Sequence, residues 1–145
     1  MEEILKKIKH TYECMTTDAK GSARGIEILW NSIEFIVDYW IGMKRILTGR
    51  FRLIGHINWF LVSEVYGPHI TVERGNFLTQ MQQLENMHTK KLWLIVGDFN
   101  MITSKEENKG GIQREEPDMA RFKETHSALK MIDIHTINGK YTWNN

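Results

Sequence analysis

The chain has 145 residues, of which 41% are hydrophobic and 26% are charged, and its formal net charge is +1. This length fits one domain over residues 1–145, and the composition excludes wholesale disorder. A net charge close to zero gives no evidence for a nucleic-acid or membrane partner. The lone Cys14 excludes an internal disulfide framework and fits a reducing compartment. No apolar stretch reaches membrane-spanning length and the charged start is not a secretory signal, so we expect an intracellular protein, nuclear or cytoplasmic.

The first part of the chain is expected to form one helix followed by strands. Residues 1–15 carry apolar side chains at helical spacing, which predicts an amphipathic helix. The members of this set are Ile4, Leu5, Ile8, Tyr12 and Met15. Alternating apolar residues predict strands over 25–30 and 33–39. Their common faces would carry Ile26, Ile28 and Trp30 in the first strand, and Ile33, Phe35, Val37 and Tyr39 in the second.

A pair of strands and two helices are expected next. Residues 51–57 and 59–66 have the pattern of antiparallel strands joined by a tight turn near Asn58. Helical spacing then predicts helices over 72–89 and 117–130, the second with a proline at its first position. Their buried stripes would be Phe77, Leu78, Met81 and Leu84 in the first helix, and Met119, Phe122 and Leu129 in the second.

The remaining elements are short strands. Residues 92–96 form an apolar run that is too short for an independent helix, and we expect a strand buried on both faces. Residues 132–134 and 141–143 are expected to be short strands around an Asn-Gly turn. The order of helices and strands predicts a layered α/β domain with a mixed sheet.

The apolar strand stops at the tetrapeptide Gly97-Asp98-Phe99-Asn100. Because side chains alternate along a strand, Asp98 and Asn100 are expected to point the same way, with Phe99 turned toward the core. A carboxylate beside a carboxamide suits the activation and positioning of a water molecule, so a hydrolytic site is the leading hypothesis. The alternative is a strand-end turn, where Gly, Asp and Asn are common for backbone reasons.

Several further signatures stand in a fixed order along the chain. They are Gly21–Ile26 with Ile28–Asn31, then Val65-Tyr66-Gly67-Pro68, Gly97–Asn100, Gly110-Gly111 and Tyr141–Asn144. This ordered set resembles the endonuclease/exonuclease/phosphatase superfamily, and most closely the apurinic-type endonuclease domain of plant LINE-type retrotransposons. The resemblance covers essentially the whole chain. It implies an α/β (α+β) fold, a four-layer α/β/β/α sandwich with mixed, largely antiparallel sheets, incomplete at both ends of this chain.

The resemblance also implies an activity, the metal-dependent hydrolysis of phosphodiesters in DNA, with Mg²⁺ as the usual metal. In this family Asp98 would align or deprotonate the attacking water, and Asn100 would help to hold that water and the phosphate. The hydroxyl of Tyr66 would reach the phosphate, since a phenol can donate a hydrogen bond to its oxygens.

Three further residues are candidates for contact with nucleic acid. The strand that carries Trp143 lies beside the substrate groove in the family, which implies a possible DNA contact. Arg50 and Arg52 belong to a stretch in which every charge is basic, and such a cluster can contact phosphates. The alternative for the two arginines is a solvated strand face.

Two departures from the family pattern concern the metal. The chain begins after the position of the family's metal-binding glutamate, and it ends before the Ser-Asp-His segment that completes the site. The metal ligands of this chain are therefore unknown, and we expect the fragment to be inactive. The alternative function is a non-catalytic, truncated retroelement remnant with at most weak nucleic-acid binding. A phosphatase or lipid phosphodiesterase of the same superfamily is a further alternative, and no membrane or obligate protein partner is expected.

Overall fold

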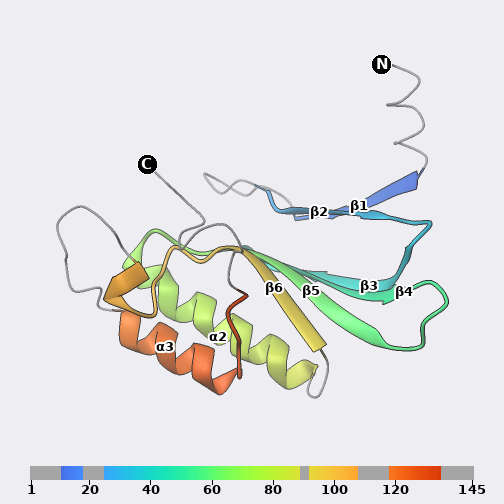
Figure 1. Cartoon of the computed structure of the whole chain (residues 1–145). Helices are drawn as coiled ribbons and strands as arrows, with labels where there is room; N and C mark the ends of the chain where they lie inside the picture. Colours follow the sequence, from blue (N-terminus) through green and yellow to red (C-terminus); the bar gives the residue numbers. More distant parts are fainter. Residues whose placement is uncertain (1–10, 18–24, 89–91, 108–117, 135–145) are drawn as a thin grey trace. The chain divides into compact units, whose positions relative to one another are not determined.

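The computed structural model describes residues 11–17, 25–88, 92–107 and 118–134, which fall into two compact units (Figure 1). The first unit comprises Met1–Gly67 and His88–Phe99, and the second comprises Pro68–Met87 and Asn100–Asn145. The expectation of one domain over the whole chain stays a prediction. Within the described ranges, no helix combines the length and the apolar character that crossing a membrane requires.

The described part of the first unit consists of two sheets. Its strands are β1 (Tyr12–Thr16), β2 (Glu27–Asn31), β3 (Phe35–Gly42), β4 (Ile46–Leu53), β5 (Trp59–Tyr66) and β6 (Leu92–Asp98). Strands β1 and β2 form an antiparallel pair, and the larger sheet has the order β3-β4-β5-β6. Its first three strands are antiparallel, whereas β5 and β6 are parallel because a helical crossover separates them in the chain. The expectation of mixed, largely antiparallel sheets is confirmed.

An apolar layer joins the two sheets of this unit. Met15 of β1 is 2% exposed and lies against Gly49 of β4, where an added Cβ would stand 2.6 Å from the Met15 Cε. The Trp30 ring of β2 meets the Phe51 ring of β4 edge-on, with 5.9 Å between centroids. The layer also contains Ile26, Ile28, Phe35, Val37, Leu47, Phe60, Val62 and Tyr66. The expected common face of Ile26, Ile28 and Trp30 is therefore confirmed.

The helix expected over residues 1–15 is wrong for residues 12–15, whereas Thr11 is helical as expected. Tyr12–Thr16 form strand β1, which pairs with β2, while residues 1–10 lie outside the described part. Met15 is buried in this strand and its neighbours are exposed. A five-residue strand with one buried side chain shows no alternation of apolar residues, so the helical spacing was misleading.

Strand β3 differs from its expected pattern at one point. Val37 pairs with Phe51 and Tyr39 pairs with Arg50, so one extra residue, Asp38, is inserted between them as a β-bulge. The insertion reverses the alternation, and Tyr39 leaves the apolar face that Phe35 and Val37 share. The prediction that Tyr39 would lie on that face is therefore wrong.

A chain of buried polar side chains links three strands of the larger sheet. Thr48 of β4 and Ser63 of β5 are cross-strand partners whose hydroxyl oxygens lie 2.6 Å apart. The indole N–H of Trp93 on β6 donates to the same serine oxygen at 2.8 Å. Ser63 is 0% exposed and Thr48 is 1% exposed, so water cannot replace the bond between their hydroxyl groups.

Replacement of the central hydroxyl is expected to weaken the sheet. Ser63→Ala removes the acceptor of the half-buried Trp93 N–H and the partner of the buried Thr48 hydroxyl, which should lower the free energy of unfolding by about 2 kcal/mol. Urea denaturation measures this change, and Ser127→Ala on an exposed helical position is the matched control. Equal midpoints for the two variants would contradict the prediction.

The second unit contains helices α2 (Thr71–Met87) and α3 (Met119–Ala128) and a short 3₁₀ helix, η1 (Lys105–Glu107). The predicted buried residues of α2 are confirmed, and Phe122 is buried in α3 as expected. Arg74 of α2 pairs with Asp118 just before α3 at 3.7 Å, with side chains only 9% and 8% exposed. A buried ion pair of this kind fixes the two helices to each other, since removing one partner would leave the other charge unpaired.

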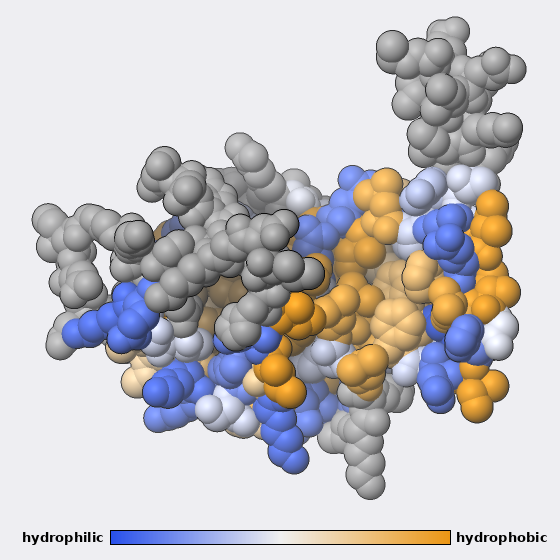
Figure 2. All heavy atoms as spheres, in the orientation of Figure 1, coloured by the Kyte–Doolittle hydropathy of each residue, from blue (hydrophilic) through white to orange (hydrophobic). Residues whose placement is uncertain are grey.

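Exposed apolar side chains contradict two predictions. Strand β6 is not buried on both faces, because Leu92 is 76% exposed, Leu94 39% and Val96 43%. Figure 2 shows hydrophobic residues gathered on the visible surface over the strands of Figure 1. Residues 132–134 do not form a strand, and Ile132 and Ile134 are 89% and 80% exposed. Residues 141–143 lie outside the described part.

Candidate functional site

Tyr66 and Asp98 lie side by side at the ends of two parallel strands. They are register partners at the last positions of β5 and β6, so their side chains leave the same face of the sheet. The backbone N–H of Gly67 donates to the Asp98 carbonyl at 2.6 Å, which continues the ladder past the strand ends. The Asp98 carboxylate is exposed and the tyrosine is half-buried. A phenol and a solvent-accessible carboxylate are therefore presented together.

Two glycines allow this close approach of the strand ends. A side-chain carbon at Gly97 would overlap the Val65 carbonyl oxygen, and one at Gly67 would overlap the Phe99 carbonyl oxygen. Gly97 also has a φ of +127°, which side chains other than glycine rarely adopt. These two glycines position Asp98 against the end of β5.

Asn100 does not follow the strand alternation from which its direction was predicted. Strand β6 ends at Asp98, and Asn100 has a φ of +51°, in the left-handed region. Asparagine tolerates this conformation better than most residues do. The shared direction of Asp98 and Asn100 was inferred for a continuing strand, and that premise is wrong.

The carboxyl group of Glu64 shares the face of the sheet that carries Tyr66. It stands two residues before the tyrosine on β5, opposite Val96 of β6. Burial raises the pKa of the Glu64 carboxyl, and the negative charge of Glu27 on β2 raises it further. Burial and the neighbouring Glu27 therefore both disfavour a negative charge on Glu64.

The raised pKa of Glu64 predicts a pH-dependent effect of Glu64→Gln on stability. A carboxyl whose pKa rises on folding contributes stability below its unfolded value of about 4.5, and this contribution is lost as the pH rises through the folded pKa. The glutamine variant avoids the disfavoured charge, so its thermal midpoint should exceed that of the unmodified chain at pH 7. The difference should vanish near pH 4. Glu34→Gln, at an exposed position, is the control, and a difference that grows toward low pH would contradict the prediction.

Arg50 and Arg52 lie far from Tyr66 and Asp98. Arg52 pairs with Trp59, the first residue of β5, whereas Tyr66 is the last, which separates them by roughly 23 Å along the strand. Both guanidinium groups stack on the Trp59 ring, at 4.6 Å and 4.9 Å from its centroid. They also lie on the opposite face of the sheet, since they pair with odd-numbered residues of β5. If these arginines contact nucleic acid, they do so on a surface separate from that of Tyr66 and Asp98.

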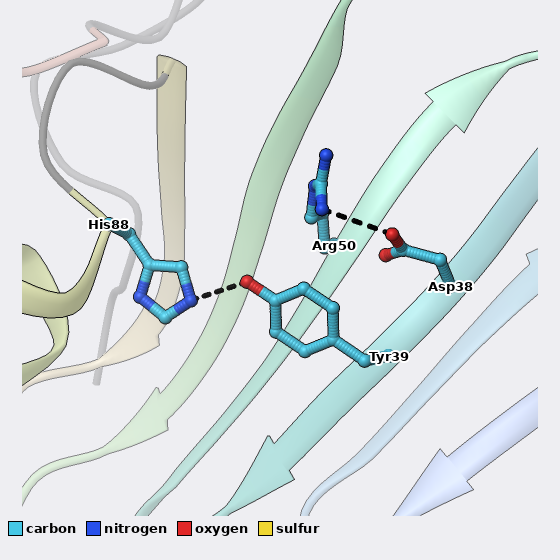
Figure 3. A network of polar contacts seen from close by, with 4 residues as sticks. All are labelled: Asp38, Tyr39, Arg50 and His88. Carbon is cyan, nitrogen blue, oxygen red and sulfur yellow. Dashed lines mark hydrogen bonds and ion pairs between the residues drawn. The ribbon is translucent and has the colours of Figure 1, made fainter.

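A polar network surrounds Arg50 on that opposite face (Figure 3). The Tyr39 hydroxyl and the His88 Nε2 point toward one another and lie 2.5 Å apart, and Asp38 pairs with Arg50 at 3.1 Å. Burial raises the pKa of the Tyr39 phenol, while Arg50 opposes this rise and Asp38 adds to it. Sequence reasoning missed the network, because only the bulge in β3 turns Tyr39 toward His88. Trp143, the other predicted contact residue, lies outside the described part.

The metal ligands, which the sequence left unknown, are not identified among the described residues. Over these ranges, no group of three or more His, Cys, Asp or Glu side chains could hold a metal ion. The donors beside Tyr66 are the carboxylates of Asp98 and Glu64 on neighbouring strands. Carboxylate oxygens are the type of ligand that Mg²⁺ accepts.

Comparison with known proteins supports the fold. No protein-family model matches the sequence, and no curated protein sequence does. An endonuclease/exonuclease/phosphatase family protein from Bacteroides thetaiotaomicron matches with a TM-score of 0.52 and 15% identity, over 68% of this chain and 44% of that one. The human Nocturnin catalytic domain with bound sulfate matches with a TM-score of 0.50 and 14% identity, over 68% of this chain and 45% of that one.

These likenesses define the class of fold. The mixed α/β arrangement with two sheets and two helices in the described residues is the fold of endonuclease/exonuclease/phosphatase proteins, as expected. This chain spans less than half the length of the two solved structures. Their low identity leaves substrate and activity to be inferred from the site itself.

Proposed function

We propose that this chain carries a phosphoester-hydrolysing site in which Asp98 and Tyr66 contact the substrate. The observation that supports this proposal is the register of the parallel strands β5 and β6, which makes Tyr66 and Asp98 neighbours at one edge of the sheet. The fold of an endonuclease/exonuclease/phosphatase protein is consistent with a phosphoester substrate.

The two side chains have complementary roles in such a reaction. Asp98 accepts a proton from a water molecule as the water oxygen attacks phosphorus, while the bond to the leaving oxygen breaks. The Tyr66 hydroxyl donates a hydrogen bond to a non-bridging oxygen, where negative charge accumulates. Asn100 can hold the same water or the phosphate through its amide, a role that stays a prediction.

We further propose that the substrate is DNA and that the chain is an endonuclease of a LINE-type retrotransposon. The ordered sequence signatures around Tyr66 and Asp98 support it. Mg²⁺ is the proposed cofactor, since carboxylates at the sheet edge are suitable oxygen donors. Trp143, Arg50 and Arg52 are proposed DNA contacts, the two arginines on a surface separate from Asp98.

Nicking of supercoiled plasmid DNA tests this function. The chain is incubated with plasmid and Mg²⁺, and a second reaction contains EDTA. A mock purification from cells without the protein controls for contaminating nucleases. The endonuclease proposal predicts nicking that needs both the chain and the metal. Hydrolysis of a phosphomonoester but not of DNA would indicate a phosphatase instead of an endonuclease.

A non-catalytic remnant is the second candidate, and two observations favour it. The described residues lack a three-ligand metal group, and the apolar side chains of β6 are exposed. Such a chain would bind nucleic acid weakly and cleave no phosphoester. The absence of Mg²⁺-dependent turnover on plasmid, phosphodiester and phosphomonoester substrates alike would establish this alternative.

A further inference from the structure

Arg45, a positively charged residue of the β3–β4 turn, lies beside the paired residues Tyr66 and Asp98. Arg45 directly precedes β4, and its backbone carbonyl accepts the Tyr66 N–H at 3.0 Å. Its side-chain Nη1 donates to the Tyr66 carbonyl at 3.4 Å. Since Tyr66 pairs with Asp98, these three residues form a continuous row across neighbouring strand ends.

The charged groups that share a face of the sheet with Tyr66 are carboxylates, so Arg45 supplies the positive charge that an anionic substrate needs. Asp98 and Glu64 bring carboxylates to the face that carries Tyr66, and Glu27 is near enough to raise the pKa of Glu64. Carboxylates alone would repel a phosphate group. A guanidinium keeps its positive charge at every accessible pH, and its planar set of five N–H donors matches phosphate oxygens.

We propose that Arg45 binds the phosphoryl group of the substrate and holds Tyr66 in position for it. This inference rests on the proposed function and deepens it, because it names the residue that makes the site accept an anion. One guanidinium can serve both purposes, since its donors point in several directions. The bond to the Tyr66 carbonyl fixes where the charge lies relative to the phenol.

A purely structural arginine is the competing explanation, and three variants separate the two. Arg45→Gln keeps an N–H donor but removes the charge, and Arg45→Lys keeps the charge but loses the planar donor set. Lys44→Gln removes the neighbouring exposed cation of the same turn and is the matched control. If Arg45 only fixes the turn, the unfolding midpoint will change without a change in anion affinity.

The test is a titration with inorganic phosphate, followed through the backbone amide signals of Tyr66 and Gly67 in a ¹⁵N-labelled chain. Saturable shifts are expected for the unmodified chain. Arg45→Gln should weaken the apparent Kd about 10- to 100-fold, the range for loss of a charged hydrogen bond. Arg45→Lys should lie between the two, and Lys44→Gln should bind like the unmodified chain.

Each contrary result has a distinct meaning. Equal phosphate affinity of Arg45→Gln and the unmodified chain overturns the role of Arg45 and leaves the proposed hydrolysis standing. If Arg45→Gln does not fold, Arg45→Lys decides in its place, and unaltered affinity there overturns the inference. An unmodified chain that hydrolyses phosphoesters without phosphate shifts at Tyr66 and Gly67 overturns it as well. A chain that neither binds phosphate nor hydrolyses a phosphoester refutes both proposals.

Discussion

Gly97→Ala should be the most damaging single substitution in the described part of the chain. An alanine Cβ would overlap the Val65 carbonyl oxygen, and it would have to adopt a φ of +127°. Backbone strain and overpacking each cost about 1 to 3 kcal/mol, so we expect a loss of roughly 2 to 6 kcal/mol. Because ordinary domains are stable by only about 5 to 15 kcal/mol, this loss would remove a large share of the protein's stability.

Two other glycines separate the causes of this loss. Gly55 has a φ of +84° and open space around it, so Gly55→Ala should cost about 1 kcal/mol from strain alone. Gly67→Ala meets the Phe99 carbonyl oxygen and tests the steric overlap. Urea denaturation of all three variants gives the comparison. Equal losses for Gly97→Ala and Gly55→Ala would show that β5 and β6 separate easily at this point.

If the chain hydrolyses phosphoesters as proposed, Asp98→Asn should abolish most of that activity while leaving the fold intact. The amide is nearly the same size as the carboxylate, and the side chain is exposed, so the strand ends need not move. The asparagine amide cannot accept the proton of the attacking water. Loss of a general base lowers reaction rates by about 10²- to 10⁴-fold. Initial rates of Mg²⁺-dependent phosphodiester cleavage measure the effect.

The same chemical change at a distant exposed position is the control for Asp98→Asn. The Asp133 side chain is 65% exposed, and Asp133→Asn should leave the cleavage rate unaltered. Amide signals of Gly67 should stay in place in the Asp98 variant, because its hydrogen bond uses the backbone carbonyl. Cleavage by Asp98→Asn at the unmodified rate would show that this carboxylate is not the base.

Sequence reasoning located the elements whose apolar pattern is regular. The common face of Ile26, Ile28 and Trp30 and the buried stripe of α2 are confirmed, because burial follows one clear period in each. It failed where long-range pairing decides the structure. Tyr12–Thr16 have one buried residue and become a strand only through β2, and Ile132 and Ile134 have strand-favouring side chains but form no strand.

The residues of the candidate site were predictable from the sequence, but their arrangement depends on long-range strand pairing. The motifs identify Tyr66 and Asp98, and only the parallel register shows that they are neighbours. The positive φ of Asn100 could not be inferred, since the apolar run does not reveal where the strand ends. Arg45 was visible as one of several basic residues, but its contact with Tyr66 depends on the start of β4 beside the end of β5.

The bulge in β3 divides that strand between two environments. Val37 before it belongs to the apolar layer, and Tyr39 after it reaches His88. Deleting Asp38 would restore regular alternation in β3. The Tyr39 phenol would then point into the apolar layer and lose its hydrogen bond to His88. One inserted residue thus places the Tyr39 phenol beside His88 and also supplies the carboxylate that pairs with Arg50.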